Sequence, residues 1–277
     1  MTLRADLAVT ARRAAISVVP LRVVGAAVRT LYPRIEPELA RLGEIMPRGG
    51  TALDVGAWFG PWSTRMTRYA DRVVALEAHP DLAGLLRRSL PRVSVVHAAA
   101  SDGPGEIDLL VPAGGPAVGV CCVEGSTRVE AGAAQAADPV GAADPVRAAE
   151  PVWGRPVAVP RLTIDSLGLT DVRFVKMDIE GHELAALRGA ERTIRRDLPP
   201  VLLELEERLQ PVSRVVELLA SWGYTGEVLL GPSWRPLAQF DLVAHQRETL
   251  RRVHQSFVRR LVWPRPRYVN MVLFRAR

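Results

Sequence analysis

The chain has 277 residues, of which 48% are apolar and 24% are charged, and its formal net charge is +6. This composition excludes a collagen-like chain, a disulfide scaffold and wholesale disorder, and the length allows one large domain or two small ones. Of the 36 basic residues all but Lys176 are arginine.

The positive charge lies at the two ends of the chain. Residues 1–50 carry eight arginines against four acids and residues 242–277 carry nine against one, which leaves the stretch between them at net −6. A nucleic-acid-binding protein usually places its basic excess on the module that reads the ligand. We therefore expect no nucleic-acid partner.

Two features of the sequence bear on the cellular compartment of the protein: its two cysteines and its N-terminal apolar stretch. Cys121 and Cys122 are adjacent, where an intramolecular disulfide would be severely strained, so a reducing, cytoplasmic environment is expected. The apolar stretch 14–31 contains Arg22 and Arg29, and is therefore a poor membrane span or secretory signal. Residues 1–48 are predicted to form a basic helical extension that folds over the core or contacts a second copy; peripheral membrane contact through the basic flanks and a homodimer stay open.

From residue 51 onward, short β-branched apolar runs alternate with helix-length segments. Helices are expected to begin near Pro61, Pro80, Gly181 and Pro211. Continuous apolar strands separated by helices are typical of a parallel sheet covered on both faces, so residues 49–277 are predicted to form a doubly wound α/β domain. The predicted strands are Thr51–Val55, Arg72–Leu76, Val93–Val96, Val172–Met177, Val201–Leu205, Gly226–Leu230 and Tyr268–Phe274.

A low-complexity segment interrupts this alternation at about 113–156. Within it, residues 136–152 repeat alanine, acid, proline and valine every six residues, which forbids a continuous helix. Because the segment has little apolar bulk to offset the entropy of ordering, it is predicted to be a surface insert, with a role as a lid left open.

Three predicted strands end in residues suited to a positively charged ligand that contains a nucleoside. The turn after Asp54 contains Gly56 and Gly60, whose spacing does not match the pyrophosphate-binding glycine loop, and the acid suits a ligand with an ammonium group. Glu77 at the second strand tip can accept the hydroxyls of a ribose. At the third tip, Ala100 leaves room for adenine, and the neighbouring Ser101 and Asp102 can bond its edge.

The most distinctive segment is Lys176-Met177-Asp178-Ile179-Glu180-Gly181-His182-Glu183, where a strand gives way to a helix. Alternation places Lys176 and Asp178 on one face of the strand. The pair is either structural or functional, and its position at a carboxyl-end strand tip favours function. His182 is either solvated or part of the site.

At this point the chain resembles the FkbM family of S-adenosylmethionine-dependent methyltransferases over about residues 50 to 207. The resemblance rests on DVGAWFG, ALEAHP, AASDGPGEIDL, VPRLTIDSLGL, PVLLELE and, above all, KMDIEGHELAALRGAERTI. It implies the class I methyltransferase fold, Rossmann-like, with seven strands and an antiparallel last strand.

The resemblance also implies roles for individual residues. By position, Asp54, Gly56, Ala57 and Gly60 would hold the methionine end, Glu77 the ribose, and Ser101 and Asp102 the adenine. Ala100 and Asp178 border the same cofactor site. Trp58 and Ala78 lie at its rim, where the chain departs from the family: asparagine is usual at the first position, and a Pro-Asn pair where Ala78 and His79 stand.

Methyl transfer to a hydroxyl benefits from a general base. The predicted catalytic residues are Asp178, Lys176, Glu180, His182 and Glu204, with Glu206 a further candidate for the base. Asp178 with Glu204 or Glu206 could instead hold a divalent metal through oxygen ligands, an option that we do not favour because no specific ligand spacing demands it.

The sequence thus predicts an S-adenosylmethionine-dependent methyltransferase that O-methylates a small molecule, such as a sugar, a lipid or a secondary-metabolite scaffold. The acceptor class rests on the resemblance alone. Segments 1–35 and 244–267 are expected to form the acceptor pocket or a dimer contact. Two alternatives stay open. One is a nicotinamide-dependent oxidoreductase, which would require the pyrophosphate-binding glycine loop that the sequence lacks. The other is a non-catalytic binding protein that uses its basic flanks at a membrane surface.

Overall fold

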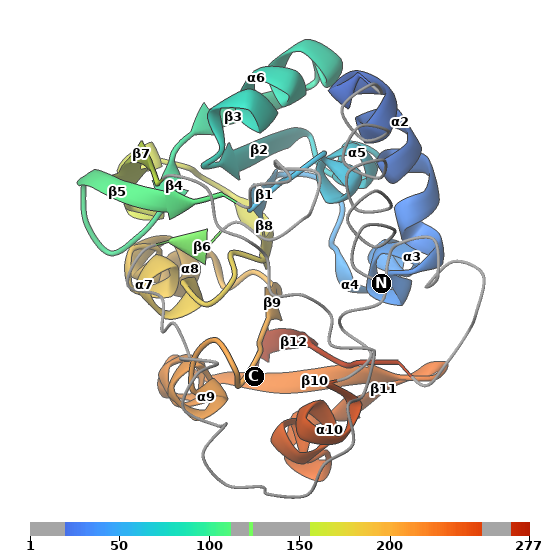
Figure 1. The fold of residues 1–277 in the computed structure, drawn as a ribbon. Helices are drawn as coiled ribbons and strands as arrows, with labels where there is room; N and C mark the ends of the chain where they lie inside the picture. The colour runs from blue at the N-terminus through green and yellow to red at the C-terminus, as the bar shows by residue number, and fades with distance from the viewer. Residues whose placement is uncertain (1–19, 112–121, 124–155, 251–266) are drawn as a thin grey trace, which may run out of the picture.

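The computed structural model describes residues 20–111, 122–123, 156–250 and 267–277 (Figure 1). Its main sheet has eight strands: β1 (Thr51–Val55), β2 (Arg72–Glu77), β3 (Val93–His97), β8 (Val172–Met177), β9 (Val201–Glu204), β10 (Tyr224–Leu230), β11 (Ser233–Pro236) and β12 (Met271–Ala276). Their order is β11-β10-β12-β9-β8-β1-β2-β3.

The central strands run parallel and the C-terminal part of the sheet is reversed. β3, β2, β1, β8 and β9 pair in parallel, whereas β12 is antiparallel to both β9 and β10. All seven predicted strands occur, so the α/β class, the mostly parallel sheet and the reversed last strand are confirmed. The predicted number of seven strands is too low, because the chain turns back after β10 at Gly231 to add β11 at the edge.

A second, smaller sheet was not predicted. It contains β4 (Ala99–Ala100), β5 (Gly105–Leu110), β6 (Cys122–Val123) and β7 (Val157–Leu162), in the order β4-β7-β5-β6. Two of these strands have only two residues, and Pro160 weakens the strand pattern of β7. Apart from β6 and residue 156, the predicted insert at about 113–156 lies outside the described residues, as do residues 1–19 and 251–266 of the basic flanks.

The α-helices of the described residues are α2 (Leu21–Leu31), α3 (Pro37–Ala40), α4 (Leu42–Ile45), α5 (Pro61–Met66), α6 (Pro80–Ser89), α7 (Glu183–Arg188), α8 (Glu191–Asp197), α9 (Val212–Ser221) and α10 (Leu242–Thr249). The starts predicted at Pro61 and Pro80 are confirmed, and those near Gly181 and Pro211 lie one or two residues further along. No helix in the described part of the chain has the length and apolar character that crossing a bilayer requires.

Alternating side chains give the sheet two buried faces. Leu53 and Val55 pack in one core with the inner sides of α7, α8 and α9, whereas Ala52 and Phe174 pack in another with α3, α4 and α5. Figure 1 shows these two groups of helices on opposite sides of the sheet. This two-sided covering explains why the parallel strands are apolar along their length.

The N-terminal helices are packed into the molecule. Val28 of α2 is buried against Phe59 and Leu82, and Arg29 donates to the carbonyl oxygen of Phe59 at 3.0 Å. Glu38 of α3 is completely buried and binds Arg267, which precedes β12. The described part of the predicted extension therefore folds over the core; the boundary at residue 48 stays a prediction.

Candidate active site

The predicted site residues meet where the parallel strands end. Val55 is in register with Leu76 of β2 and with Met177 of β8, and Met177 is in register with Leu203 of β9. The residues that follow these positions therefore share one edge of the sheet. Open α/β sheets bind their ligands at this carboxyl edge, so the geometry supports a site there.

Lys176 lies beneath this edge and joins two strand tips. Its side chain is 2% exposed, and its Nζ atom lies 3.5 Å from Asp54 Oδ1 and 3.4 Å from Asp178 Oδ2. The ammonium also donates to the carbonyl oxygen of Gly56 at 3.0 Å. Burial alone would lower the pKa of Lys176, but the carboxylates of Asp178 and Asp54 outweigh it and hold that pKa above its ordinary value.

Asp54 is directed into the molecule. Its side chain has no exposed surface, and Ser63 of α5 donates to Oδ2 at 2.5 Å. Asp54 therefore lies below the predicted cofactor surface, where it fixes Lys176 and the first turn of α5. The partner Ser63 was not singled out in the sequence.

Two glycines let the loop after β1 pass close to its neighbours. Gly56 has φ +75°, and a Cβ atom there would lie 1.9 Å from the carbonyl oxygen of Asp178. Gly60 has φ +78°, and a Cβ there would lie 2.6 Å from Leu90. Gly56 thus brings the β1 and β8 loops together, while Gly60 allows α5 to pack close to Leu90; buried Ala57 lies between them.

Glu77 anchors the turns on both sides of it. It is buried, and its two oxygens accept from the backbone N–H of Trp58 at 2.7 Å and of His79 at 2.8 Å. Burial raises the pKa of Glu77 to about 7. Trp58 has φ +51° and packs edge-on against Tyr32, while the carbonyl of Ala78 lies 3.0 Å from His97 Nε2.

The third strand tip is joined to the β8 loop by a short polar chain. Ser101 is completely buried and donates to Asp102 at 3.3 Å, and its Oγ lies 3.1 Å from His182 Nε2. Ala100, also buried, precedes them. Burial lowers the pKa of His182, so the neutral imidazole is favoured. The interpretation of His182 as a simply solvated side chain is wrong, because it is partly buried and bound to Ser101.

Carboxylates crowd the space beside Asp178. Ligand atoms of Asp178, Glu180 and Glu204 all lie within 4.8 Å of one another. Burial raises the pKa of Glu204 well above its ordinary range, and the neighbouring Asp178 and Glu180 raise it further. Asn270, which the sequence did not reveal, donates to Glu204 at 2.5 Å. Such a group can accept and hold a proton, and its spacing would also suit a divalent cation.

Glu206 is more deeply buried than Glu204 and contacts a different residue. It is buried and paired with Arg208, so it is less available than Glu204 for a bound molecule. Glu183, the last residue of the distinctive motif, received no role from the sequence. It is buried at the start of α7, and it accepts backbone N–H groups of the loop that carries Asp178.

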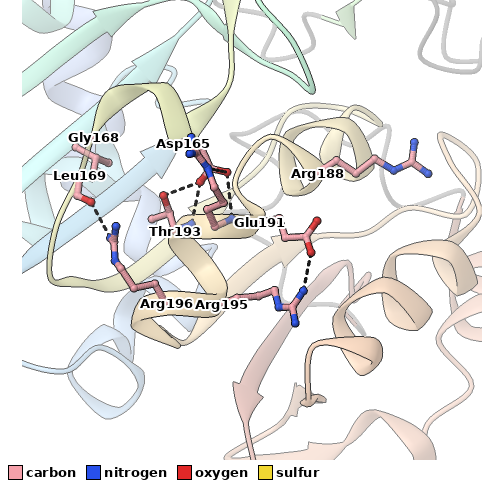
Figure 2. Close-up of a pocket in the computed structure, with 9 residues that line it drawn as sticks. Asp165, Gly168, Leu169, Arg188, Glu191, Thr193, Arg195 and Arg196 are labelled. Carbon is pink, nitrogen blue, oxygen red and sulfur yellow. Dashed lines mark hydrogen bonds and ion pairs between the residues drawn. The ribbon is translucent and has the colours of Figure 1, made fainter.

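A separate surface hollow of about 690 Å³ lies against α8 (Figure 2). Asp165 accepts from the Thr193 backbone and hydroxyl there, and Arg196 donates to the carbonyl oxygen of Leu169. Its lining includes Leu169, three residues before β8 begins, whereas Asp178 follows the end of that strand. Because these polar groups already bind one another, we assign the hollow no part in the site.

Comparison with known proteins gives a family. The profile of the methyltransferase FkbM domain matches residues 54–225. No curated protein matches the sequence.

Three solved structures are among those to which the chain is similar. The methyltransferase FkbM of Methylobacillus flagellatus KT is 14% identical (TM-score 0.47), and the alignment covers 93% of this chain and 62% of that protein. A TehB-like SAM-dependent methyltransferase of Corynebacterium glutamicum is 11% identical (TM-score 0.41, 87% of each chain). Precorrin-6y C5,15-methyltransferase of Geobacter metallireducens is 15% identical (TM-score 0.39, 73% of this chain and 80% of that chain).

Proposed function

Because this chain belongs to the family of FkbM methyltransferases, whose domain spans more than half of it, we propose that it is an S-adenosylmethionine-dependent O-methyltransferase of small molecules. The observation that carries the proposal is the buried Lys176, which binds both the glycine loop after β1 and the carboxylate of Asp178 after β8. This contact supports the proposal because it brings the loop that we assign to the cofactor close to the residue that we assign as the base.

The residues at the carboxyl edge fit the cofactor. Gly56 adopts the positive φ that this turn requires, and the acidic edge suits the ammonium and sulfonium charges. We assign Gly56, Ala57 and Gly60 to the methionine end, with Asp54 acting from below. Glu77 would accept the ribose hydroxyls, while Ala100, Ser101 and Asp102 would border the adenine. Trp58 and Ala78 would line the rim.

The bound cofactor supplies an electrophilic methyl group, and the chain orients the acceptor and removes its proton. Asp178 is suited to the second task because its side chain is 28% exposed and stands beside Lys176. Asp178 would take the proton from the acceptor hydroxyl as that oxygen is methylated. Glu204, whose pKa is raised, is placed to hold that proton afterwards.

Calorimetry with S-adenosylmethionine, followed by transfer of a labelled methyl group to methyl glycosides, long-chain alcohols and polyketide alcohols, tests the proposal. We expect cofactor binding, and label on oxygen in one acceptor class. Absence of binding at ~1 mM cofactor would contradict the proposal, whereas binding of a nicotinamide dinucleotide instead would favour an oxidoreductase.

The base is tested separately. We expect Asp178→Asn to bind the cofactor as the wild type does but to transfer methyl groups ~100-fold more slowly or worse. Retained turnover would remove Asp178 from this role. Turnover lost with a chelator and restored by Mg²⁺ would show instead that the three carboxylates hold a metal.

The remaining partner assignments are also proposals. We propose a hydroxyl-bearing small molecule as the acceptor, no nucleic-acid partner and a cytoplasmic location. A homodimer and membrane-surface contact through the basic flanks are left to sedimentation and vesicle-binding measurements. If neither cofactor class bound while vesicles did, the non-catalytic alternative would replace the enzyme.

A further inference from the structure

The loop of residues 178–182, which carries Asp178 and Glu180, has a backbone that requires outside support. Glu180 has φ +53° and Gly181 has φ +92°. A side-chain-bearing residue in the left-handed region costs about 1–3 kcal/mol and persists only where its surroundings impose it. The position of Asp178 therefore depends on whatever holds this loop.

Glu183 supplies the support from inside the molecule. It is the first residue of α7 and only 1% exposed. Its Oε1 accepts from the backbone N–H of Ile179 at 3.0 Å, and its Oε2 accepts from that of Gly181 at 3.1 Å. One side chain thus satisfies two backbone donors on either side of the strained residue.

Gln210 extends this support to the next strand. It is buried in the turn after β9, donates to Glu183 Oε2, and is held by its own N–H bond to the carbonyl oxygen of Glu206 at 3.1 Å. A Cβ atom on Gly181 would lie 3.0 Å from Leu209 Cβ, so the loop and the turn are in close contact. The Glu183–Gln210 pair therefore connects the segment that bears Asp178 to the segment that follows Glu204.

We propose that Glu183, braced by Gln210, is a positioning residue that sets the place of the Asp178 carboxylate relative to Glu204 during methyl transfer. The inference rests on the proposed function. Glu183 is not itself a catalytic residue, because its bonds are directed to the backbone and to Gln210 and its surface is closed to a bound acceptor.

The support is tested without any acceptor by amide hydrogen exchange of the full chain. We expect the Ile179 and Gly181 amides to exchange at least ~10-fold faster in Glu183→Ala than in the wild type. Glu183→Gln should keep them protected, because Gly181 N also lies 3.4 Å from Oε1 and the Gln210 amide can turn to face the new donor. Glu191→Ala, which removes only an exposed pair with Arg195, is the matched control.

Catalysis and cofactor binding give the second readout. Glu183→Ala should lower kcat ~100-fold for the acceptor class labelled by the wild type, with S-adenosylhomocysteine affinity changed less than ~3-fold, and Glu183→Gln should restore kcat. Protected amides in Glu183→Ala, or a loss of S-adenosylhomocysteine affinity that matches the loss of kcat, would overturn the proposal. If the wild type methylates nothing, the proposed function fails, while the exchange result still decides whether Glu183 holds the loop.

Discussion

At the scale of single residues, the sequence left open whether Lys176 has a structural or a functional role. It neutralises Asp54 and Asp178 while remaining 2% exposed. Because it is buried, its contribution to the proposed methyl transfer would be to hold the loop after β1 and the carboxylate after β8. A compact ammonium suits this space better than the planar fork of an arginine.

We expect Lys176→Met to destabilise the protein by about 3–5 kcal/mol, because Asp54 would remain buried without its cation. Adding Asp54→Asn should recover part of that loss, and urea unfolding of the two single variants and the double variant measures the coupling. Arg173→Met on the same strand removes an exposed pair with Asp171 and an exposed bond to the carbonyl oxygen of Arg48, and should have a small effect. If the stability losses of the two single variants simply added in the double variant, this would contradict an interaction between Lys176 and Asp54.

Glu77 gives a stability effect that depends on pH. Its folded pKa of about 7 exceeds the ordinary value of 4.5, so its contribution to stability is complete below pH 4.5 and is lost as the pH rises through about 7. Glutamine mimics the protonated acid at every pH. The free energy of unfolding of Glu77→Gln, relative to that of the wild type, should therefore rise by about 3 kcal/mol between pH 4.5 and pH 8. Urea unfolding at several pH values checks this; parallel pH profiles for the two proteins would contradict it.

At the scale of elements, the site depends on how closely the β1 and β8 loops approach. Gly56→Ala would place a methyl group 1.9 Å from the Asp178 carbonyl oxygen and should weaken S-adenosylmethionine binding at least ~10-fold by displacing both loops. Gly168→Ala is the control, since Gly168 has φ +60° but nothing within 4 Å of its Cβ position. Equal effects of the two changes on binding would show that backbone strain alone matters.

The elements also show which sequence signals were sufficient. Seven of the eight strands of the main sheet were predictable because each contains an apolar run, whereas β4 and β6 of the second sheet are too short to form a pattern. Pro160 interrupts the strand pattern of β7, and β11 has no continuous apolar run, so neither was predicted. Among the site residues, Asp178, Glu204 and Glu77 stand at strand ends and were predictable, but Asn270 and Ser63 became recognisable only from their contacts.

At the scale of the whole molecule, Arg267 joins the two ends of the described chain. It pairs with Glu36 at 3.4 Å and with Glu38, whose side chain is completely buried. We expect Arg267→Met to destabilise the protein by about 3–5 kcal/mol, because two carboxylates would lose their cation. Thermal unfolding measures the loss, and Arg275→Met, which breaks a partly exposed pair with Glu227, is the control. Equal losses in the two variants would mean that Arg267 contributes no more to stability than an ordinary surface pair.

The sequence by itself determined the alternation of strands and helices, the acidic strand tips and the single lysine, because these follow from local periodicity and from the residue types at each position. The tertiary structure decided that Lys176 is buried beneath the site, that Asp54 faces inward, and that Glu183 supports the loop of Asp178. These facts depend on strand register and on how closely loops approach, down to the missing Cβ of Gly56. Periodicity fixes the direction of a side chain along its own element, whereas the distance between two elements is set by packing across the sheet.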